Sequence, residues 1–451
     1  MTPKAPRRLR EDLIAQVCLE AYGGVRRDGR LADRALDFVL RQRKQLYSSE
    51  RRAVAERVYA LLRRQRLVDF LVEKGWKGFA ELAVSKQDLV RLGVARLLEG
   101  DTADEVADGL SFKGDDARRL RHVFDARVKL EKLSSLERFA IEASLPDFAA
   151  QKLVEEVGDE AMEAAEAMNV RGPLFGRVNT LRATREQVLT ALTREGVEVH
   201  ETALSPLGVR LETRTNVYSL EAFKQGLFEV QDEGSQLLGM LVDAPPTKVV
   251  DACAGAGGKT LQLAAQMKNR GELFAFDVDA RRLDELRERT RRADAHNVRV
   301  RALTDDDEAL APVSALVGQA HRVLIDAPCS GSGTFRRKPD GRYRLTEASL
   351  AEHVALQKRL LERFSPLVRP GGLLVYGTCS FFRDENEAVV EDFLGRHPEY
   401  RLLPAERSLG APLAGQTCRE GMLRLFPHRH GTDAFFGAIL ERKAPAAPRG
   451  G

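Results

Sequence analysis

The chain has 451 residues, which is longer than one ordinary domain and predicts two to three domains. Hydrophobic residues make up 43% and charged residues 31%, as in a soluble protein, and no apolar run approaches the roughly 20 residues of a membrane span. The formal net charge of +4 is too small to indicate a polyanionic partner by itself, so local clusters must carry that argument.

The 5 cysteines are widely spaced, and none forms a Cys-x-x-Cys pair or has a histidine at ligand spacing. This pattern argues against a metal site or a disulfide framework and leaves reactive thiols to be considered. The basic N-terminus is followed at once by amphipathic sequence with no apolar signal core. We therefore expect a cytoplasmic protein without a membrane segment.

Residues 1–136 show helical periodicity and no convincing strand, which predicts a small all-α bundle. Leu31, Ala35, Phe38 and Val39 mark one apolar face. A longer face is formed by Val54, Val58, Leu61, Leu62, Val68, Leu71 and Val72. The outer positions are rich in cations, which either contact a phosphate backbone or are simply solvated. These cations are Arg41, Arg43, Lys44, Arg51, Arg52, Arg57, Arg63, Arg64 and Arg66.

Residues 137–171 remain helical and become acidic, as in a connecting segment. From Gly172 the pattern changes to short strands and turns, so residues 172–226 predict a compact α+β insert. Its expected elements are strands at Phe175–Val178, Val197–Glu201 and Val209–Glu212 and a helix at Arg185–Glu195.

Residues 227–443 alternate apolar strands with helices, which predicts an α/β domain with a parallel sheet covered on both faces. The expected strands are Lys248–Ala252, Glu272–Val278, Val298–Leu303, Arg322–Ala327 and Gly372–Thr378, with a later strand at Phe435–Glu441. Ligands of such sheets bind beyond the carboxyl ends of the strands. We expect the Pro/Ala/Gly-rich tail, residues 444–451, to be disordered.

A glycine-rich loop follows the first strand of this domain, from Cys253 to Thr260. It lacks the first glycine of a P-loop and the third glycine of a dinucleotide motif, where Thr260 stands. Asp277 ends the next strand about 20 residues after Gly255, where a carboxylate can accept both ribose hydroxyls of a nucleoside. Such a loop with a ribose acid indicates S-adenosylmethionine, although structural glycines in a tight turn would give the same pattern.

Two cysteines follow the ends of apolar strands, Cys329 after Pro328 and Cys379 after Thr378. A single buried cysteine is usually just a small hydrophobic residue. Two at equivalent places, each followed by serine, indicate instead a catalytic pair of thiols. In a parallel sheet both would lie at the same edge.

Together these motifs resemble the Sun (Fmu) family of RNA 5-methylcytosine methyltransferases. The similarity covers roughly residues 177–441 and is carried by Asp326-Ala327-Pro328-Cys329-Ser330, Gly377-Thr378-Cys379-Ser380 with Glu385-Asn386-Glu387, Cys253–Thr260 and Gln231-Asp232. The helical N-terminus is similar to the NusB-like RNA-binding domain of the 16S ribosomal RNA member. The resemblance implies a Rossmann-like methyltransferase domain, preceded by a helical RNA-binding domain and an α+β RNA-binding insert.

The resemblance also implies the roles of individual residues. The Cys379 thiolate would add to carbon 6 of cytosine, Asp326 would hold the N3 and amino edge, and Cys329 would help to remove the carbon 5 proton. Lys259 would approach the catalytic loop. The implied cofactor residues are Cys253, Ala254, Gly255, Gly257, Gly258, Lys259, Asp277, Arg282, Asp326 and an acid of the Asp305–Asp307 run, most simply Asp305.

Two positions depart from the family pattern, which has proline where Ala256 stands and glycine where Ala434 stands. Neither departure removes a reacting group, but Ala256 is expected to loosen cofactor binding. The cations after the Cys329 loop would take phosphates beside a base drawn from its stack, unless the loop is simply solvated. These cations are Arg336, Arg337, Lys338, Arg342 and Arg344. Except for Arg282, the arginines of the helix after Asp279 are expected to be solvated surface.

The leading hypothesis is methylation of carbon 5 of an RNA cytosine by a monomeric enzyme, with 16S ribosomal RNA as the expected substrate and transfer RNA as the alternative. A second hypothesis is a non-catalytic RNA-binding assembly factor on the same fold, against which both cysteines and Asp326 argue. An amino-group methyltransferase would need an Asn/Asp-Pro-Pro-aromatic loop where Asp326–Cys329 stands.

Overall fold

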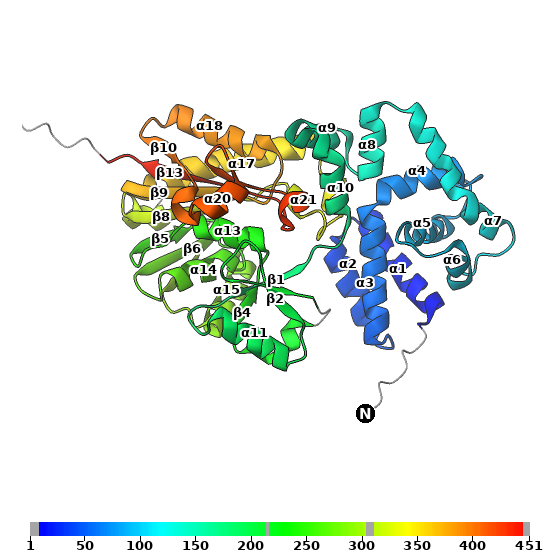
Figure 1. Ribbon diagram of the computed structural model, residues 1–451, viewed down its shortest axis with the longest axis horizontal. Coiled ribbons are helices and arrows are strands. Elements are labelled where there is room, and N and C mark those ends of the chain that lie inside the picture. Colours follow the sequence, from blue (N-terminus) through cyan, green and yellow to red (C-terminus); the bar gives the residue numbers. More distant parts are fainter. Residues whose placement is uncertain (1–8, 213–215, 304–310, 445–451) are drawn as a thin grey trace, which may run out of the picture. The chain divides into compact units, whose positions relative to one another are not determined.

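The computed structural model describes residues 9–212, 216–303 and 311–444 of the chain (Figure 1). The chain divides into two compact units, one of residues 1–171 and 335–346 and the other of residues 172–334 and 347–451. None of the helices in the described ranges has the length and apolar composition that crossing a membrane requires. The same ranges hold no cluster of three His, Cys, Asp or Glu side chains that could bind a metal ion.

The described part of the first unit consists of helices and loops, as the sequence predicted. The long helices are α1 (Glu11–Arg26), α2 (Ala32–Gln42), α3 (Ser48–Arg63), α4 (Gln65–Gly75), α5 (Val84–Leu98), α8 (Ser135–Ala143), α9 (Asp147–Val157) and α10 (Ala161–Asn169). The shorter ones are α6 (Ala103–Gly109), α7 (Asp115–His122), α16 (Gly341–Arg344) and the 3-10 segments η1 (Val123–Lys132) and η2 (Gly158–Glu160).

The core of this unit is formed by the predicted apolar faces, except that the buried face of α2 is rotated about the helix axis relative to the prediction. All seven residues of the longer face, from Val54 to Val72, are buried, and they belong to two helices, α3 and α4. On α2 the buried stripe includes Ala35 and Val39, but Leu31 and Phe38 are about half exposed. The predicted face of α2 is therefore wrong at these two residues, because Ala32 and Leu36 occupy the inner positions instead.

Many of the arginines expected on the outer surface of this unit have partners within it. Arg57 pairs with Glu11 at 2.8 Å, and Arg66 pairs with Asp147 at 2.6 Å. Arg51 donates to the carbonyl oxygen of Leu40 at 2.7 Å. A guanidinium that is satisfied in this way stabilises the fold and is a poor candidate for a phosphate contact. The phosphate-binding alternative is therefore disfavoured for these residues.

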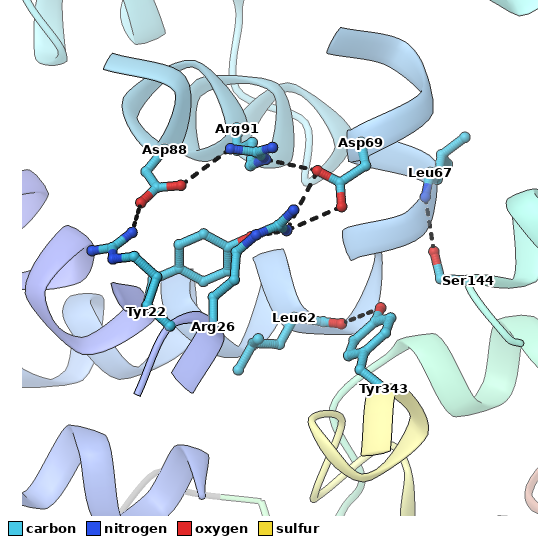
Figure 2. Close-up of polar contacts among 10 residues, drawn as sticks. Tyr22, Arg26, Leu62, Leu67, Asp69, Asp88, Arg91, Ser144 and Tyr343 are labelled. Carbon is cyan, nitrogen blue, oxygen red and sulfur yellow. Dashed lines mark hydrogen bonds and ion pairs between the residues drawn. The ribbon is translucent and has the colours of Figure 1, made fainter. Parts of the chain in front are cut away.

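An ion-pair network joins three helices of the bundle (Figure 2). Asp69 of α4 accepts from Arg26 of α1 at 3.1 Å and from Arg91 of α5 at 2.7 Å. Arg91, which is nearly buried, also reaches Asp88 at 3.2 Å. Because each buried charge has an opposite charge beside it, the network fixes α1, α4 and α5 against one another.

The segment Phe335–Thr346 is part of the first unit although it directly follows the Cys329 loop in the sequence. Arg342 is fully buried and donates to the Asn169 side-chain oxygen at 2.6 Å and to the carbonyl oxygen of Arg63 at 2.8 Å. The hydroxyl of Tyr343 donates to the carbonyl oxygen of Leu62 at 2.7 Å (Figure 2). Arg336 is also buried, so the predicted phosphate role is wrong for Arg336 and Arg342.

The second unit begins with a small antiparallel sheet in the order β2-β3-β1-β4. Its strands are β1 (Leu174–Val178), β2 (Val199–Glu201), β3 (Gly208–Leu211) and β4 (Phe228–Val230), and its helices are α11 (Arg185–Arg194), α12 (Glu221–Lys224) and η3 (Val217–Ser219). Val178, Val209 and Phe228 bury the inner face of the sheet. The predicted α+β insert is thus present. Its fourth strand, β4, lies just beyond the predicted end of the insert at residue 226.

A nine-stranded sheet forms the rest of the unit in the order β11-β12-β13-β9-β8-β5-β6-β7, with β10 also paired to β13. The neighbours from β9 to β7 run parallel, and the pairs that involve β10 to β13 are antiparallel, so the sheet is mixed and not purely parallel. Its strands are β5 (Lys248–Asp251), β6 (Glu272–Asp277), β7 (Val298–Ala302), β8 (Ala320–Asp326), β9 (Val368–Thr378), β10 (Tyr400–Leu403), β11 (Cys418–Arg419), β12 (Met422–Leu425) and β13 (Phe435–Arg442).

Helices cover both faces of the large sheet, as expected for a Rossmann-like fold. Val323 packs with helices α17 and α18, whereas the next residue, Leu324, packs with α13 and α14. The helices are α13 (Glu233–Leu241), α14 (Gly258–Gln266), α15 (Ala280–Ala293), α17 (Glu347–Phe364), α18 (Glu387–Arg396), α19 (Glu406–Leu409), α20 (Ala411–Thr417) and α21 (Pro427–His430), with η4 (Ala311–Leu316), η5 (Ser332–Thr334), η6 (Ser365–Leu367) and η7 (Arg383–Glu385).

Candidate active site

Two cysteine loops meet at the carboxyl ends of β8 and β9. These parallel strands place Asp326 opposite Gly377, so the loops that follow leave the sheet at the same edge. The sulfur atoms of Cys329 and Cys379 lie 3.4 Å apart, in hydrogen-bond contact. The fold thus brings together the two thiols that the sequence singled out.

The surroundings of Cys329 oppose ionisation of its thiol. The hydrogen bond to Cys379 raises the pKa of the Cys329 thiol well above its ordinary value, and desolvation and the nearby Glu385 carboxylate act in the same direction. Either sulfur can be the donor in the contact between them. Because the thiolate is the nucleophilic form of cysteine, the raised pKa makes Cys329 a poor candidate for the attacking sulfur.

A buried polar network that the sequence did not predict joins the two cysteine loops. The hydroxyl of Ser380 lies 3.3 Å from the hydroxyl of Ser330 and 3.0 Å from that of Ser332. Glu385 accepts the N–H of Ser330 at 2.8 Å and its O–H at 2.6 Å. The serine after each cysteine was the sequence signal from which this network could have been suspected.

Lys259 and Asp326 form an ion pair beside the thiols. The Lys259 ammonium lies 2.7 Å from Oδ2 of Asp326, and its side chain is 9% exposed against 31% for Asp326. The ammonium also lies 5.4 Å from the centre of the Phe435 ring. The expected approach of Lys259 to the catalytic loop is thus observed, and it orients the Asp326 carboxylate.

The glycine-rich loop is held against the end of β6 by a hydrogen bond from a backbone N–H group. The N–H of Gly255 donates to Asp277 at 2.7 Å, and Gly255 has a positive φ of 52°. A Cβ atom at this position would lie within 4.0 Å of both Asp277 and the guanidinium of Arg282. Gly257, with φ 89°, has no room for a side chain because its Cβ would lie 2.1 Å from Leu286. The donor and acceptor set fits the ribose and amino-acid ends of a nucleoside cofactor.

Ala256, which departs from the family pattern, is held by a neighbouring helix. Its carbonyl oxygen accepts from Arg289 of α15 at 2.7 Å. Arg289 and Arg292 also pair with Glu229 of β4, which is 1% exposed in its side chain, at 2.9 and 2.7 Å. The prediction that these arginines are solvated surface is therefore wrong, and the loop is braced where proline is missing.

Ala434, the second departure from the family pattern, is hydrogen-bonded to the loop that carries Cys329. Its N–H donates to the carbonyl oxygen of Gly333, whose own N–H donates to the carbonyl oxygen of Cys379, both at 3.0 Å. A Cβ atom at Gly333 would lie 2.4 Å from the Ala434 carbonyl oxygen. The alanine is accommodated because Gly333 supplies the space.

Asp251 is a buried acid beneath the cofactor loop. It accepts from the Thr260 hydroxyl at 2.7 Å, and its other carboxyl oxygen has no hydrogen-bond partner in the described residues. Burial raises the pKa of Asp251 to about 7. The carboxyl group is consequently close to half protonated at neutral pH.

The other predicted cofactor residues lie along the same loop. Burial raises the pKa of the Cys253 thiol well above its ordinary value, so this cysteine is not a candidate nucleophile. Ala254 is buried, and Gly258 begins α14. Asp305 lies outside the described residues.

The sequence and the fold both match known methyltransferases. The profile described as "16S rRNA methyltransferase RsmB/F" matches residues 240–441, and that of an RsmF/B-like ferredoxin-like domain matches residues 145–218. A curated relative from Synechocystis, named "Probable ribosomal RNA small subunit methyltransferase B", is 32% identical over 92% of this chain and 96% of its own length. The chain belongs to the RsmB/F family. S-adenosylmethionine is accordingly the cofactor of the family to which the chain belongs.

Solved structures show that the similarity spans nearly the whole chain. The crystal structure of PH0851 covers 97% of this chain and 100% of its own, with 30% identity and a TM-score of 0.76. A methyltransferase homologue from Pyrococcus horikoshii covers 69% of this chain and 100% of its own, with 30% identity and a TM-score of 0.58. The multidomain arrangement of helical domain, ferredoxin-like insert and Rossmann-like domain is thus shared.

Proposed function

We propose that this chain methylates carbon 5 of a cytosine in RNA through a transient covalent bond between Cys379 and carbon 6 of the base. The observation that carries the proposal is the 3.4 Å contact between the sulfur atoms of Cys379 and Cys329, at the sheet edge where Asp326 also ends its strand. Carbon 5 of cytosine is a poor nucleophile, and addition of a thiolate at carbon 6 converts the ring into a reactive enamine.

The residues of the chain divide the work of this reaction. Cys379 forms the sulfur–carbon bond, and the electron pair of the 5,6 double bond moves toward carbon 5. Asp326, oriented by Lys259, holds the N3 and amino edge of the ring and favours the protonated adduct. S-adenosylmethionine supplies the methyl group when it is bound. Removal of the carbon 5 proton then restores the double bond and expels the Cys379 thiolate.

Cys329 becomes the nearest base for that proton only after Cys379 has reacted. In the free protein the hydrogen bond to Cys379 is the largest cause that raises the Cys329 pKa. Once the sulfur of Cys379 is bonded to carbon it carries no charge, and this cause is removed. Ionisation of Cys329 therefore becomes easier at the step that needs a base.

Contact with RNA is supported by a basic groove between the insert and α15 in the second unit. Four cations and one acid line it: Arg182, Lys224, Arg291, Arg292 and Asp294. Because Arg292 is paired with the buried Glu229, the cations left for a phosphate contact are Arg182, Lys224 and Arg291. Such a groove suits a phosphate backbone, which needs no base-specific contact. The names of the relatives support small-subunit ribosomal RNA as the substrate, with transfer RNA as the alternative.

The experiment is methylation of purified 16S ribosomal RNA and of transfer RNA with S-adenosylmethionine that is radiolabelled in its methyl group, followed by bisulfite sequencing of the product. We expect one 5-methylcytosine in the ribosomal RNA. A product methylated on an exocyclic amino group would contradict the proposal. No methylation, together with no binding of S-adenosylmethionine by calorimetry, would favour a non-catalytic assembly factor.

A further inference from the structure

Glu385 lies under the loop that carries Cys329 and comes from the segment that follows Cys379. Its side chain is fully buried, and it ends the short helix η7. Its Oε1 atom accepts the Ser330 N–H at 2.8 Å and the Gln357 amide at 3.0 Å, and its Oε2 atom accepts the Ser330 hydroxyl at 2.6 Å. These three donors fix the position of the carboxylate.

The backbone on both sides of Cys329 is held by this arrangement. Gln357 of α17 donates to the carbonyl oxygen of Pro328 at 3.0 Å and to Glu385 at the same distance. Glu385 in turn holds Ser330. The position of the Cys329 thiol relative to Cys379 therefore depends on the carboxylate of Glu385. The backbone of Glu385 is fixed in turn, because its carbonyl oxygen accepts the Tyr376 hydroxyl at 2.6 Å.

The donors to the Glu385 carboxylate, Ser330 and Gln357, are neutral. No salt bridge to Glu385 is present in the described residues. The titratable groups that face Cys329 are Cys379 on the neighbouring loop, Glu385 on η7 and Tyr376 on β9. A negative charge on Glu385 opposes ionisation of Cys329.

We propose that Glu385 is a positioning residue that holds Cys329 against Cys379 and keeps the proton of the thiol pair on Cys329. The inference rests on the proposed function for the meaning of the two thiols. Glu385 acts through Cys329: it selects which cysteine attacks and which remains protonated until the adduct has formed.

The test is the alkylation of Cys329 by iodoacetamide between pH 6 and 9, mapped by mass spectrometry on the full chain. It is carried out in a Cys379→Ser background, so that Cys329 reports alone and the contribution of the second thiol is absent. Adding Glu385→Gln is expected to move the pH profile to lower pH and to raise the rate at pH 7.5 about tenfold, the effect of one pKa unit. An unchanged profile would overturn the proposal.

Two further variants separate charge from structure. Glu387→Gln, which changes the neighbouring acid that faces Arg424 at 3.4 Å, is the matched control and should leave the Cys329 profile unchanged. Glu385→Gln combined with Gln357→Glu returns a negative charge to the same cluster and should restore the original profile. If Glu385→Gln alone does not fold, the double variant with Gln357→Glu still tests the proposal. A double variant whose Cys329 pH profile lies about one pH unit below that of the Cys379→Ser parent would contradict the proposal, because its negative charge has been restored.

The alkylation needs neither RNA nor a methyl donor. A failure of Glu385→Gln to change the profile would therefore refute the positioning role while the methylation assay could still succeed. Conversely, absence of cytosine methylation in the wild-type protein would refute the proposed function without altering the alkylation result.

Discussion

The ammonium of Lys259 lies 2.7 Å from the carboxylate of Asp326, although one residue lies in the first turn of α14 and the other ends β8. The pair connects the cofactor loop with the loop of Cys329. It therefore couples the two halves of the reaction that we propose, the holding of the base and the supply of the methyl group.

Replacement of Lys259 by methionine should lower the single-turnover rate of methylation at least about tenfold, because Asp326 loses the cation that orients it. Binding of S-adenosylmethionine, measured by calorimetry, should change less than the rate. Lys268→Met, at an exposed position, is the control. Equal methylation rates in the two variants would show that the ion pair has no part in the reaction.

Asp251 makes the stability of the protein depend on pH. Its pKa of about 7 in the folded protein lies above the ordinary value of 3.8, so the folded state binds the proton more tightly than the unfolded state. The contribution of Asp251 to stability is therefore most favourable below about pH 4, falls as the pH rises, and is fully lost above about pH 7.

Asp251→Asn should remove this dependence. By linkage the variant should gain up to about 4 kcal/mol over the wild type at pH 8 and little at pH 4. Urea unfolding of both proteins across this range measures the difference, and a difference that is constant with pH would contradict the assignment.

Arg342 fixes the segment after the Cys329 loop within the helical unit. Arg342→Met removes a buried guanidinium and leaves the Asn169 oxygen and the Arg63 carbonyl oxygen without their donor. We expect a loss of about 3 kcal/mol in the unfolding free energy of that unit. Arg342→Lys should not restore it, since an ammonium lacks the planar fork of donors.

Arg344→Met is the control. The Arg344 side chain is 40% exposed, so this variant should change the unfolding free energy by less than about 1 kcal/mol. Denaturant unfolding of the full chain is the measurement. If both variants unfold alike, the buried contacts of Arg342 are not what holds the segment.

The basic groove of the second unit should determine affinity for RNA without determining sequence preference. Lys224→Glu and Arg182→Glu are expected to weaken binding to all RNA sequences. Each should also reduce the slope of log binding constant against log salt concentration by about the value of one phosphate contact. Lys358→Glu, on α17, changes the charge equally outside the groove and is the control. Fluorescence titration at several salt concentrations reports the slopes, and equal slopes for all three variants would contradict the assignment.

The sequence predicted the central strands of the large sheet well, because β5 and the second half of β9 are buried on both faces and appear as short apolar runs. The strand expected at Gly372–Thr378 is present, although β9 already begins at Val368. The inner face of α2 was harder to predict, because Leu31 and Phe38 are apolar but lie outside the stripe. Hydrophobicity alone does not fix the rotation of a short helix.

The contacts of charged residues were the least predictable part. Nothing local in the sequence distinguishes Arg342, which binds carbonyl oxygens of distant helices, from an arginine that binds phosphate. The Glu385 network was missed for the same reason, since Glu385 and Ser330 are 55 residues apart and meet only in the folded sheet. The two thiols were found because each marks the end of its own strand.

The covalent role of Cys379 is tested most directly by trapping. Cys329→Ser, incubated with S-adenosylmethionine and 16S ribosomal RNA, should accumulate a protein–RNA adduct that survives a denaturing gel, because the bond forms but is not released. The double variant with Cys379→Ser should give none. An adduct that persists without Cys379, or no adduct in an active Cys329→Ser protein, would contradict the account.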